Sequence, residues 1–163
     1  MTFDQYEVVK ALDFERLGGS EGERRGMEVL TGYITDAGLK YSVHPFQLFG
    51  FDTGAATVKV GGNSFSVHPY GLSSSGTITG ELCFLENADI LAYNVGAFRD
   101  KIIMSYTTSR RIADLLSEAG AAAYIGVSAP LKGNFSFSHR QKAYADGSTI
   151  PSVTVSYEDA QRL

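Results

Sequence analysis

The chain has 163 residues, of which 44% are hydrophobic and 20% are charged, and these proportions are typical of a folded globular protein. The 18 acidic residues outnumber the 14 basic ones, so the formal net charge is -4 and the sequence offers no basic surface for nucleic acid or an anionic membrane. The single cysteine, Cys83, excludes a disulfide framework within the chain. Its apolar neighbours place it in the predicted core.

The sequence gives no sign of membrane insertion or export. No apolar stretch reaches the roughly 20 residues that a membrane-spanning helix needs. The first ten residues carry Asp4 and Glu7 and lack the basic and then apolar order of a signal peptide. We therefore expect neither a transmembrane segment nor a signal peptide in this chain, and the compartment stays unknown.

The first strong pattern along the chain predicts a helix over residues 21–37, with a weaker and shorter helix over 3–12 before it. Ser20 and Glu23 have the spacing of a capping box, in which two side chains satisfy backbone donors of the first turn. Gly38 is the kind of residue that closes a helix in the left-handed conformation. Between them, apolar residues recur every three or four positions. These residues are Met27, Leu30, Ile34 and Ala37.

After residue 38 the apolar residues recur every second position, which predicts strands. The first predicted strand runs from Tyr41 to Leu48, and Pro45 indicates an edge position or a bulge. Two more strands, over 56–60 and 64–67, flank Gly61-Gly62-Asn63, a sequence that suits a tight hairpin turn. A further strand is expected from Thr77 to Leu85.

The second half of the chain has a strand–helix–strand order. Short buried strands are predicted over 101–106 and 121–127, and the helix between them begins at Thr107 or Thr108 and ends at Gly120. A long polar loop over 128–148 follows, and loops of this length are either functional or poorly ordered. A last strand over 150–155 and a helix over 157–163 complete the predicted elements.

Two parts of this pattern resemble known families. The segment Gly18-Gly19-Ser20-Glu21-Gly22, the helix over 21–37 and the strand through His44-Pro45-Phe46 are similar to the opening of zinc-dependent aminopeptidases of the transferrin-receptor and glutamate-carboxypeptidase superfamily. The second part looks like the protease-associated (PA) domain that is inserted in many of those enzymes. The segments that carry this second likeness are Asp100-Lys101-Ile102-Ile103-Met104, Glu118-Ala119-Gly120-Ala121-Ala122-Ala123 and Ile150-Pro151-Ser152-Val153-Thr154-Val155.

The resemblance implies an α+β fold, with a mainly β, partly open barrel or sandwich of PA type, flanking helices and an N-terminal helical segment. Residues 1–42 would be the first part of a peptidase domain, and residues 43–163 the PA domain. The parent enzyme would use two zinc ions to release N-terminal amino acids from peptides. The partners implied are the missing peptidase catalytic domain and the peptide substrate of the parent; a homodimer stays open.

The residues themselves predict no catalytic site and no metal site in this chain. A two-zinc centre needs a cluster of histidines and carboxylates, and in the family it begins with a His-x-Asp segment after the PA insertion. The three histidines are His44, His68 and His139, and none has a carboxylate two residues later. Neither a His-Glu-x-x-His helix nor a Gly-x-Ser-x-Gly turn is present, so we expect no cofactor in this chain.

One segment keeps a role in substrate access open. The loop over 131–149 is rich in basic and aromatic residues, and among them His139, Arg140 and Tyr144 are candidate residues of a lid beside the active site of the parent enzyme. The alternative is a solvated loop that two or three aromatic side chains anchor.

Two other functions stay open on the sequence. One is a stand-alone PA module that binds a protein or peptide, and the other is a PA domain of a subtilisin-like protease. The coding sequence after Leu163 would discriminate between them, because a His-x-Asp segment followed later by Glu-Glu favours the aminopeptidase.

Overall fold

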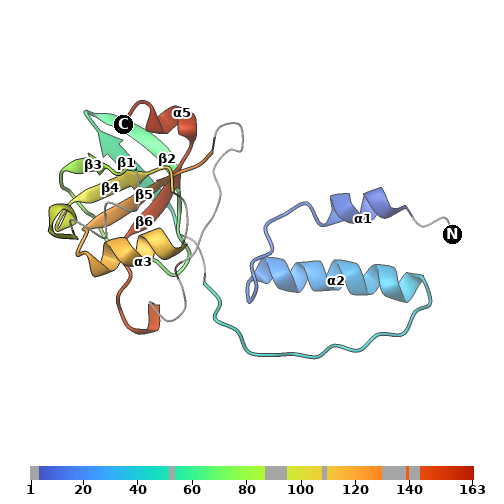
Figure 1. Cartoon of the computed structure of the whole chain (residues 1–163). Coiled ribbons are helices and arrows are strands. Elements are labelled where there is room, and N and C mark those ends of the chain that lie inside the picture. Colours follow the sequence, from blue (N-terminus) through green and yellow to red (C-terminus); the bar gives the residue numbers. More distant parts are fainter. Residues whose placement is uncertain (1–3, 52–53, 87–94, 108–109, 130–138, 140–143) are drawn as a thin grey trace. The chain divides into compact units, whose positions relative to one another are not determined.

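The computed structural model describes residues 4–51, 54–86, 95–107, 110–129, 139 and 144–163. The chain forms two compact units, residues 1–52 and residues 53–163, and each is described by itself (Figure 1). The sequence predicted a boundary ten residues earlier, between residues 42 and 43. Within the described residues, no helix is long and apolar enough to cross a membrane.

The first unit contains the helices α1 (Gln5–Ala11) and α2 (Glu21–Asp36), which confirm the two helices predicted there. Both begin at a capping side chain: Asp4 accepts from the Tyr6 amide, and Ser20 accepts from the Glu23 amide at 3.3 Å. The second half of the capping box differs from the expected one. The Glu23 carboxylate accepts from the amide of Gly19 at 2.6 Å, one residue before the cap.

Two glycines let the chain pass close to α2. A methyl group at Gly22 would lie 2.1 Å from the carbonyl oxygen of Glu15, and one at Gly26 would lie 3.0 Å from the Arg16 side chain. The segment that joins the two helices therefore runs directly along the first turns of α2. On the same side, the guanidinium of Arg25 lies 4.2 Å from the ring centre of Phe14.

The prediction of a strand from Tyr41 to Leu48 is wrong. Residues 39–50 contain no helix or strand, although helix α2 ends as expected, at Gly38 with a φ of +71°. The alternating apolar side chains are present, but the described part of this unit includes no strand with which they can pair. The large apolar residues exposed here are Leu39, Tyr41, Val43, Phe46, Leu48 and Phe49.

The second unit is a mixed six-stranded sheet in the order β1-β2-β6-β5-β4-β3, which curls so that its first hairpin folds over the sheet (Figure 1). Strands β3, β4, β5 and β6 are parallel, and the β1–β2 hairpin joins β6 in antiparallel fashion. The bounds are β1 Ala56–Val60, β2 Asn63–Pro69, β3 Leu82–Phe84, β4 Ile102–Ser105, β5 Ala123–Val127 and β6 Ser152–Val155.

The hairpin and the strand–helix–strand unit confirm their predictions. Gly61 and Gly62 both have positive φ, +56° and +85°, as the tight turn between β1 and β2 requires. Helix α3 (Arg110–Glu118) connects the parallel strands β4 and β5, and Gly120 follows it with a φ of +78°. The predicted strand from Thr77 is shorter than expected, because β3 begins only at Leu82.

The sheet is covered on both faces. Helix α3 packs on one face through Ile112 and Leu116, which lie against Ile103 and Tyr124 of the central strands (Figure 1). The β1–β2 hairpin and the short helix α5 (Tyr157–Ala160) cover the other face. Their contacts there include Met104, Ile125, Val155, Val67 and Ala160. Alternate residues of the central strands thus enter two separate hydrophobic clusters.

Candidate functional site

The described residues form no metal centre. No group of three or more histidines, cysteines, aspartates or glutamates in this part of the chain could hold a metal ion. His44 and His68 both have exposed side chains, the former in the 39–50 segment and the latter near the end of β2. The residues described therefore do not fit the two zinc ions that the resemblance implies for the parent enzyme, and we derive no metal chemistry from them.

A buried polar cluster surrounds His139, one of the three predicted site residues. Its Nδ1 atom lies 3.4 Å from an Asp114 carboxylate oxygen, and its Nε2 atom lies 3.0 Å from the Ser152 hydroxyl. The exposed fractions are 1% for His139, 3% for Asp114 and 2% for Ser152. The backbone amide of His139 also donates to the carbonyl of Gly71 at 2.9 Å. The cluster thus ties the residue to α3, to β6 and to the chain after β2.

Burial favours the neutral form of this imidazole. Loss of solvation lowers the pKa of His139 below its ordinary value, and the nearby Asp114 carboxylate opposes that shift only in part. A neutral ring that donates from Nδ1 to Asp114 leaves Nε2 to accept from the Ser152 hydroxyl. Protonation would make Nε2 a donor, and the Ser152 hydroxyl would then donate to the carbonyl of Ile150, 2.9 Å away.

The ring of Tyr70 packs beside the cluster, and Tyr124 packs against Tyr70. The ring of Tyr70 lies 5.8 Å from the His139 ring and 5.8 Å from the Tyr124 ring, to which it is nearly perpendicular. Burial is the main cause that raises the pKa of both phenols. Aromatic rings in these arrangements pack tightly and exclude water. The environment of His139 is therefore that of a core.

An aspartate, a histidine and a serine in contact also make up the catalytic triad of serine hydrolases. Here, however, all three side chains are at most 3% exposed, so a substrate cannot reach the serine. In this structure the cluster lies in the core of the second unit. Sequence reasoning missed the cluster because its members come from a helix, a loop and a strand that no spacing rule connects. The position of Asp114 between the apolar residues Ala113 and Leu115 of α3 is the one local hint.

Of the other two predicted lid residues, the structure describes only Tyr144. Tyr144 is 47% exposed, and Arg140 lies outside the described residues. His139 differs from an exposed lid residue because its side chain is enclosed. The contact of Arg140 and Tyr144 with a substrate stays a prediction.

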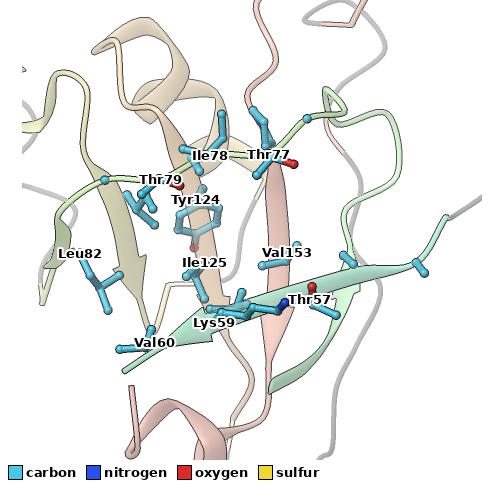
Figure 2. Close-up of a pocket in the computed structure, with 18 residues that line it drawn as sticks. Thr57, Lys59, Val60, Thr77, Ile78, Thr79, Leu82, Tyr124, Ile125 and Val153 are labelled. Carbon is cyan, nitrogen blue, oxygen red and sulfur yellow. The ribbon is translucent and has the colours of Figure 1, made fainter. Parts of the chain in front are cut away.

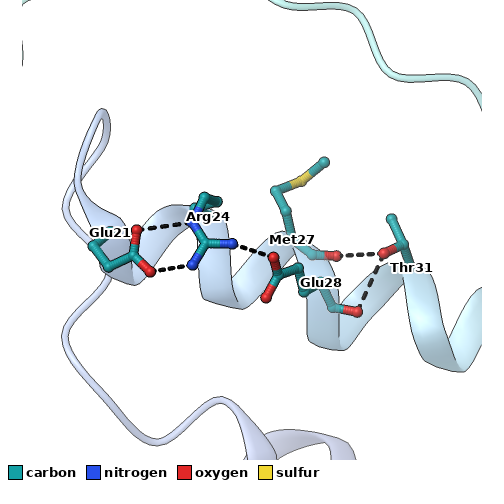
Figure 3. A network of polar contacts seen from close by, with 5 residues as sticks. All are labelled: Glu21, Arg24, Met27, Glu28 and Thr31. Atoms are coloured by element: carbon teal, nitrogen blue, oxygen red, sulfur yellow. Dashed lines mark hydrogen bonds and ion pairs between the residues drawn. The ribbon is translucent and has the colours of Figure 1, made fainter.

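Helix α2 presents a charged row and an apolar row, both exposed. Arg24 bonds with Glu21 on one side and Glu28 on the other, while Thr31 donates to the carbonyl of Met27 at 2.8 Å (Figure 3). The hydrogen bonds that Arg24 donates to the Glu21 carboxylate lower the pKa of Glu21 and raise the pKa of Arg24. Beside this row, Met27 and Leu30 are each 40% exposed, so part of the predicted apolar stripe stays open to solvent.

A cavity of about 610 Å³ lies within the second unit, between β1 and the segment 76–80. Figure 2 shows Thr77, Ile78 and Thr79 along one side and strand β1 along the other, with the sheet between them. Leu82, Ile125 and Val153 belong to the apolar surface at its base. Sequence reasoning did not identify this cavity, because it depends on how the hairpin folds back over the sheet.

No protein-family model and no curated protein matches the sequence. Two solved structures match the fold. An aminopeptidase from Aneurinibacillus sp. strain AM-1 has a TM-score of 0.61, and BSAP, a zinc aminopeptidase from Bacillus subtilis, has a TM-score of 0.67. Each is 16% identical to this chain; the matches cover 96% of this chain and 38% and 39% of the two neighbours. The chain thus shares its fold with less than two fifths of each of these aminopeptidases.

Proposed function

We propose that this chain is the non-catalytic N-terminal and PA-domain part of a zinc aminopeptidase. The parent enzyme would hydrolyse N-terminal peptide bonds with two zinc ions held by residues outside this chain. The residues described here would hold none of these ions. Their task would be to shape substrate access or to make protein contacts beside the catalytic centre.

The extent of the structural match carries this proposal. It covers 96% of the chain, so it includes both the helical unit and the sheet unit, yet it uses at most 39% of either aminopeptidase. The first portion of a peptidase with an inserted PA domain would give this result, because nearly all of the portion would match while most of the complete enzyme would stay unmatched. The curled sheet with flanking helices is compatible with the PA type.

The exposed apolar surface of the first unit supports a missing catalytic domain as the partner. Met27 and Leu30 on α2 are both 40% exposed, and several large apolar residues after α2 are exposed as well. Clusters of exposed large apolar side chains mark contact sites in soluble proteins. The residues 41–48 alternate as a strand does, and in the proposed parent they would pair with the catalytic sheet.

The predicted lid would act through Arg140 and Tyr144. In the parent, Arg140 and Tyr144 would face the peptide substrate, and the buried His139 would anchor the segment to the core. Replacing Arg140 with alanine in the complete enzyme should then change kcat/KM to different extents for short and long peptides. Equal kcat/KM values of the variant and the wild type for all lengths would remove the lid from the proposal.

The coding sequence after Leu163 gives a direct test of the parent. The proposal expects a His-x-Asp segment and, further on, Glu-Glu, as the resembled aminopeptidases have. A stop codon at that point would favour a stand-alone binding module, and a serine segment of the Gly-Thr-Ser-Met kind would favour a subtilisin-like host. Either of these results would overturn the proposal.

A further inference from the structure

The cavity beside β1 is bordered by backbone groups that have no hydrogen-bond partner among the described residues. Strand β1 is at the end of the sheet, and its register with β2 pairs Val60 with Asn63 across the two-residue turn. In such a hairpin Val60, Val58 and Ala56 form the hydrogen-bonded pairs with β2. The residues between them point their backbone N–H and C=O groups away from β2. Thr57 and Lys59 therefore direct their backbone groups toward the open side of the strand.

The opposite border has free backbone groups too. The segment Thr77–Thr79 forms no regular strand, and no backbone hydrogen bond joins it to another described residue. It runs along the far side of the cavity in Figure 2. Two polypeptide borders with free donors and acceptors thus face one space, and the volume of about 610 Å³ is within the range of ligand sites.

We propose that this cavity binds an extended peptide segment that adds to the free edge of β1 and carries a carboxylate beside Lys59. Addition of a strand to an exposed edge is a recurrent mode of peptide recognition, in which backbone hydrogen bonds give affinity and alternate side chains give specificity. The proposal concerns the second unit alone. It holds whether or not the chain belongs to an aminopeptidase.

The burial pattern of β1 determines which side chains the peptide needs. Val58 faces the apolar cluster at the base, whereas Thr57 and Lys59 are exposed on the other side of the strand. A strand paired with β1 would alternate in the same way, with apolar residues toward the base and polar residues toward solvent. The matching sequence is therefore apolar–acidic–apolar.

The charge beside the cavity, on the solvent side of β1, favours an acidic peptide. Lys59 is the only charged residue among those that line it, and it forms no ion pair with any described residue. This local positive charge contrasts with the formal net charge of -4 of the chain. A carboxylate on the solvent side of the added strand would meet an unpaired ammonium group.

The test uses the full chain, labelled with ¹⁵N, and the blocked peptide acetyl-Thr-Val-Asp-Val-Thr-amide. In either strand direction, the two valines of this peptide would face the apolar base of the cavity, and its aspartate would face Lys59. We expect saturable shifts of the amides of Thr57, Lys59 and residues 77–79. A peptide with lysine in place of aspartate should bind more weakly, and one that is N-methylated at every residue, which cannot donate along the edge in either strand direction, should not bind.

Two variants test the role of the ammonium group. Lys59→Glu should weaken binding of the aspartate peptide by roughly 2- to 10-fold, which is the size of effect that an exposed ion pair gives. The same substitution should strengthen binding of the lysine peptide. The matched charge reversal Lys40→Glu, in an exposed part of the other unit, should change neither affinity. Because Lys59 is exposed, its variant should give the amide spectrum of a folded chain.

Three outcomes would overturn the proposal. The first is the absence of saturable shifts up to the solubility limit of the peptide, which would leave Lys59 as a charge that only protects the edge from aggregation. The second is binding that N-methylation leaves unchanged. The third is a shift of the same amides with protein concentration alone, which would identify a second copy of the chain as the occupant.

Discussion

The Nε2 atom of His139 lies 3.0 Å from the Oγ atom of Ser152, and both side chains are buried. This contact joins the only described residue of the 130–143 stretch to the strand β6. With Asp114 on α3 at the other ring nitrogen, it makes a polar connection inside an otherwise apolar core. Such a connection stabilises a fold only while all its members are present.

We predict that His139→Ala lowers the free energy of unfolding by about 2–4 kcal/mol, because it creates a cavity and leaves Asp114 and Ser152 without a ring partner. Urea unfolding followed by circular dichroism measures the effect. The control is His44→Ala, which removes an exposed ring and should change stability by about 0.5 kcal/mol or less. Equal effects of the two substitutions would show that the buried contacts contribute little.

The same burial predicts a pH dependence. Because the pKa of His139 is lowered in the folded state, the unfolded chain takes up this proton first as the pH falls below the ordinary histidine value of about 6.5. The contribution of His139 to stability is then fully present above that value, and it is lost as the pH falls through the folded pKa. The variant His139→Gln should lack this pH-dependent contribution to the free energy of unfolding.

The measurement is the unfolding free energy of the wild type and of His139→Gln between pH 7.5 and the acid limit of the fold. The difference between the two curves should decrease on acidification. A difference that grows toward acid would mean that His139 is charged in the core, which would contradict the assigned neutral ring. An NMR titration of His139 would support the same assignment, with a midpoint below the ordinary histidine value.

The close passage along α2 predicts opposite effects for two glycines of the same helix. Gly22→Ala should destabilise the first unit by about 1–3 kcal/mol, because the new methyl group would meet the carbonyl of Glu15. Gly32→Ala adds the same atom where nothing lies within 4 Å, and it should stabilise the helix by roughly 0.5–1 kcal/mol. Hydrogen exchange of the α2 amides distinguishes the two. Destabilisation by both would contradict the packing of residues 15–16 on the helix.

The elements that the sequence predicted well are those whose signals are local. The turn at Gly61-Gly62, the cap at Ser20 and the stop at Gly120 each act within a few residues of the chain, and the structure confirms all three. The two predicted helices of the first unit and the α3 helix follow from the same kind of signal. Periodicity and capping therefore sufficed for most of the elements.

The failures come from interactions between distant residues. The alternation from Tyr41 to Leu48 is that of a strand, but a strand needs a partner, and the described part of the first unit offers none. His139 looked like part of a polar loop because neither Asp114 nor Ser152 is near it in sequence. The cavity at β1 likewise depends on the fold of the hairpin over the sheet. Pairing and burial over such distances cannot be read from one sequence.

The proposed interface of the first unit predicts a difference between two leucines. Leu116→Ala on α3 should cost about 2–5 kcal/mol of stability, because Leu116 is completely buried. Leu30→Ala on α2 should cost about 0.5 kcal/mol or less in this chain, since Leu30 is 40% exposed. Urea unfolding of both variants measures the difference. In the complete parent protein Leu30→Ala should become costly, and an equally small cost there would exclude Leu30 from the interface.

The central claim is that this chain carries no hydrolytic centre of its own. The direct measurement is the zinc content of the purified 163-residue chain after incubation with zinc chloride and gel filtration, together with its release of leucine from leucine p-nitroanilide. We predict zinc well below one ion per chain and a release rate equal to that of buffer, with or without a chelator. Stoichiometric zinc and chelator-sensitive release that elute with the chain would contradict the claim.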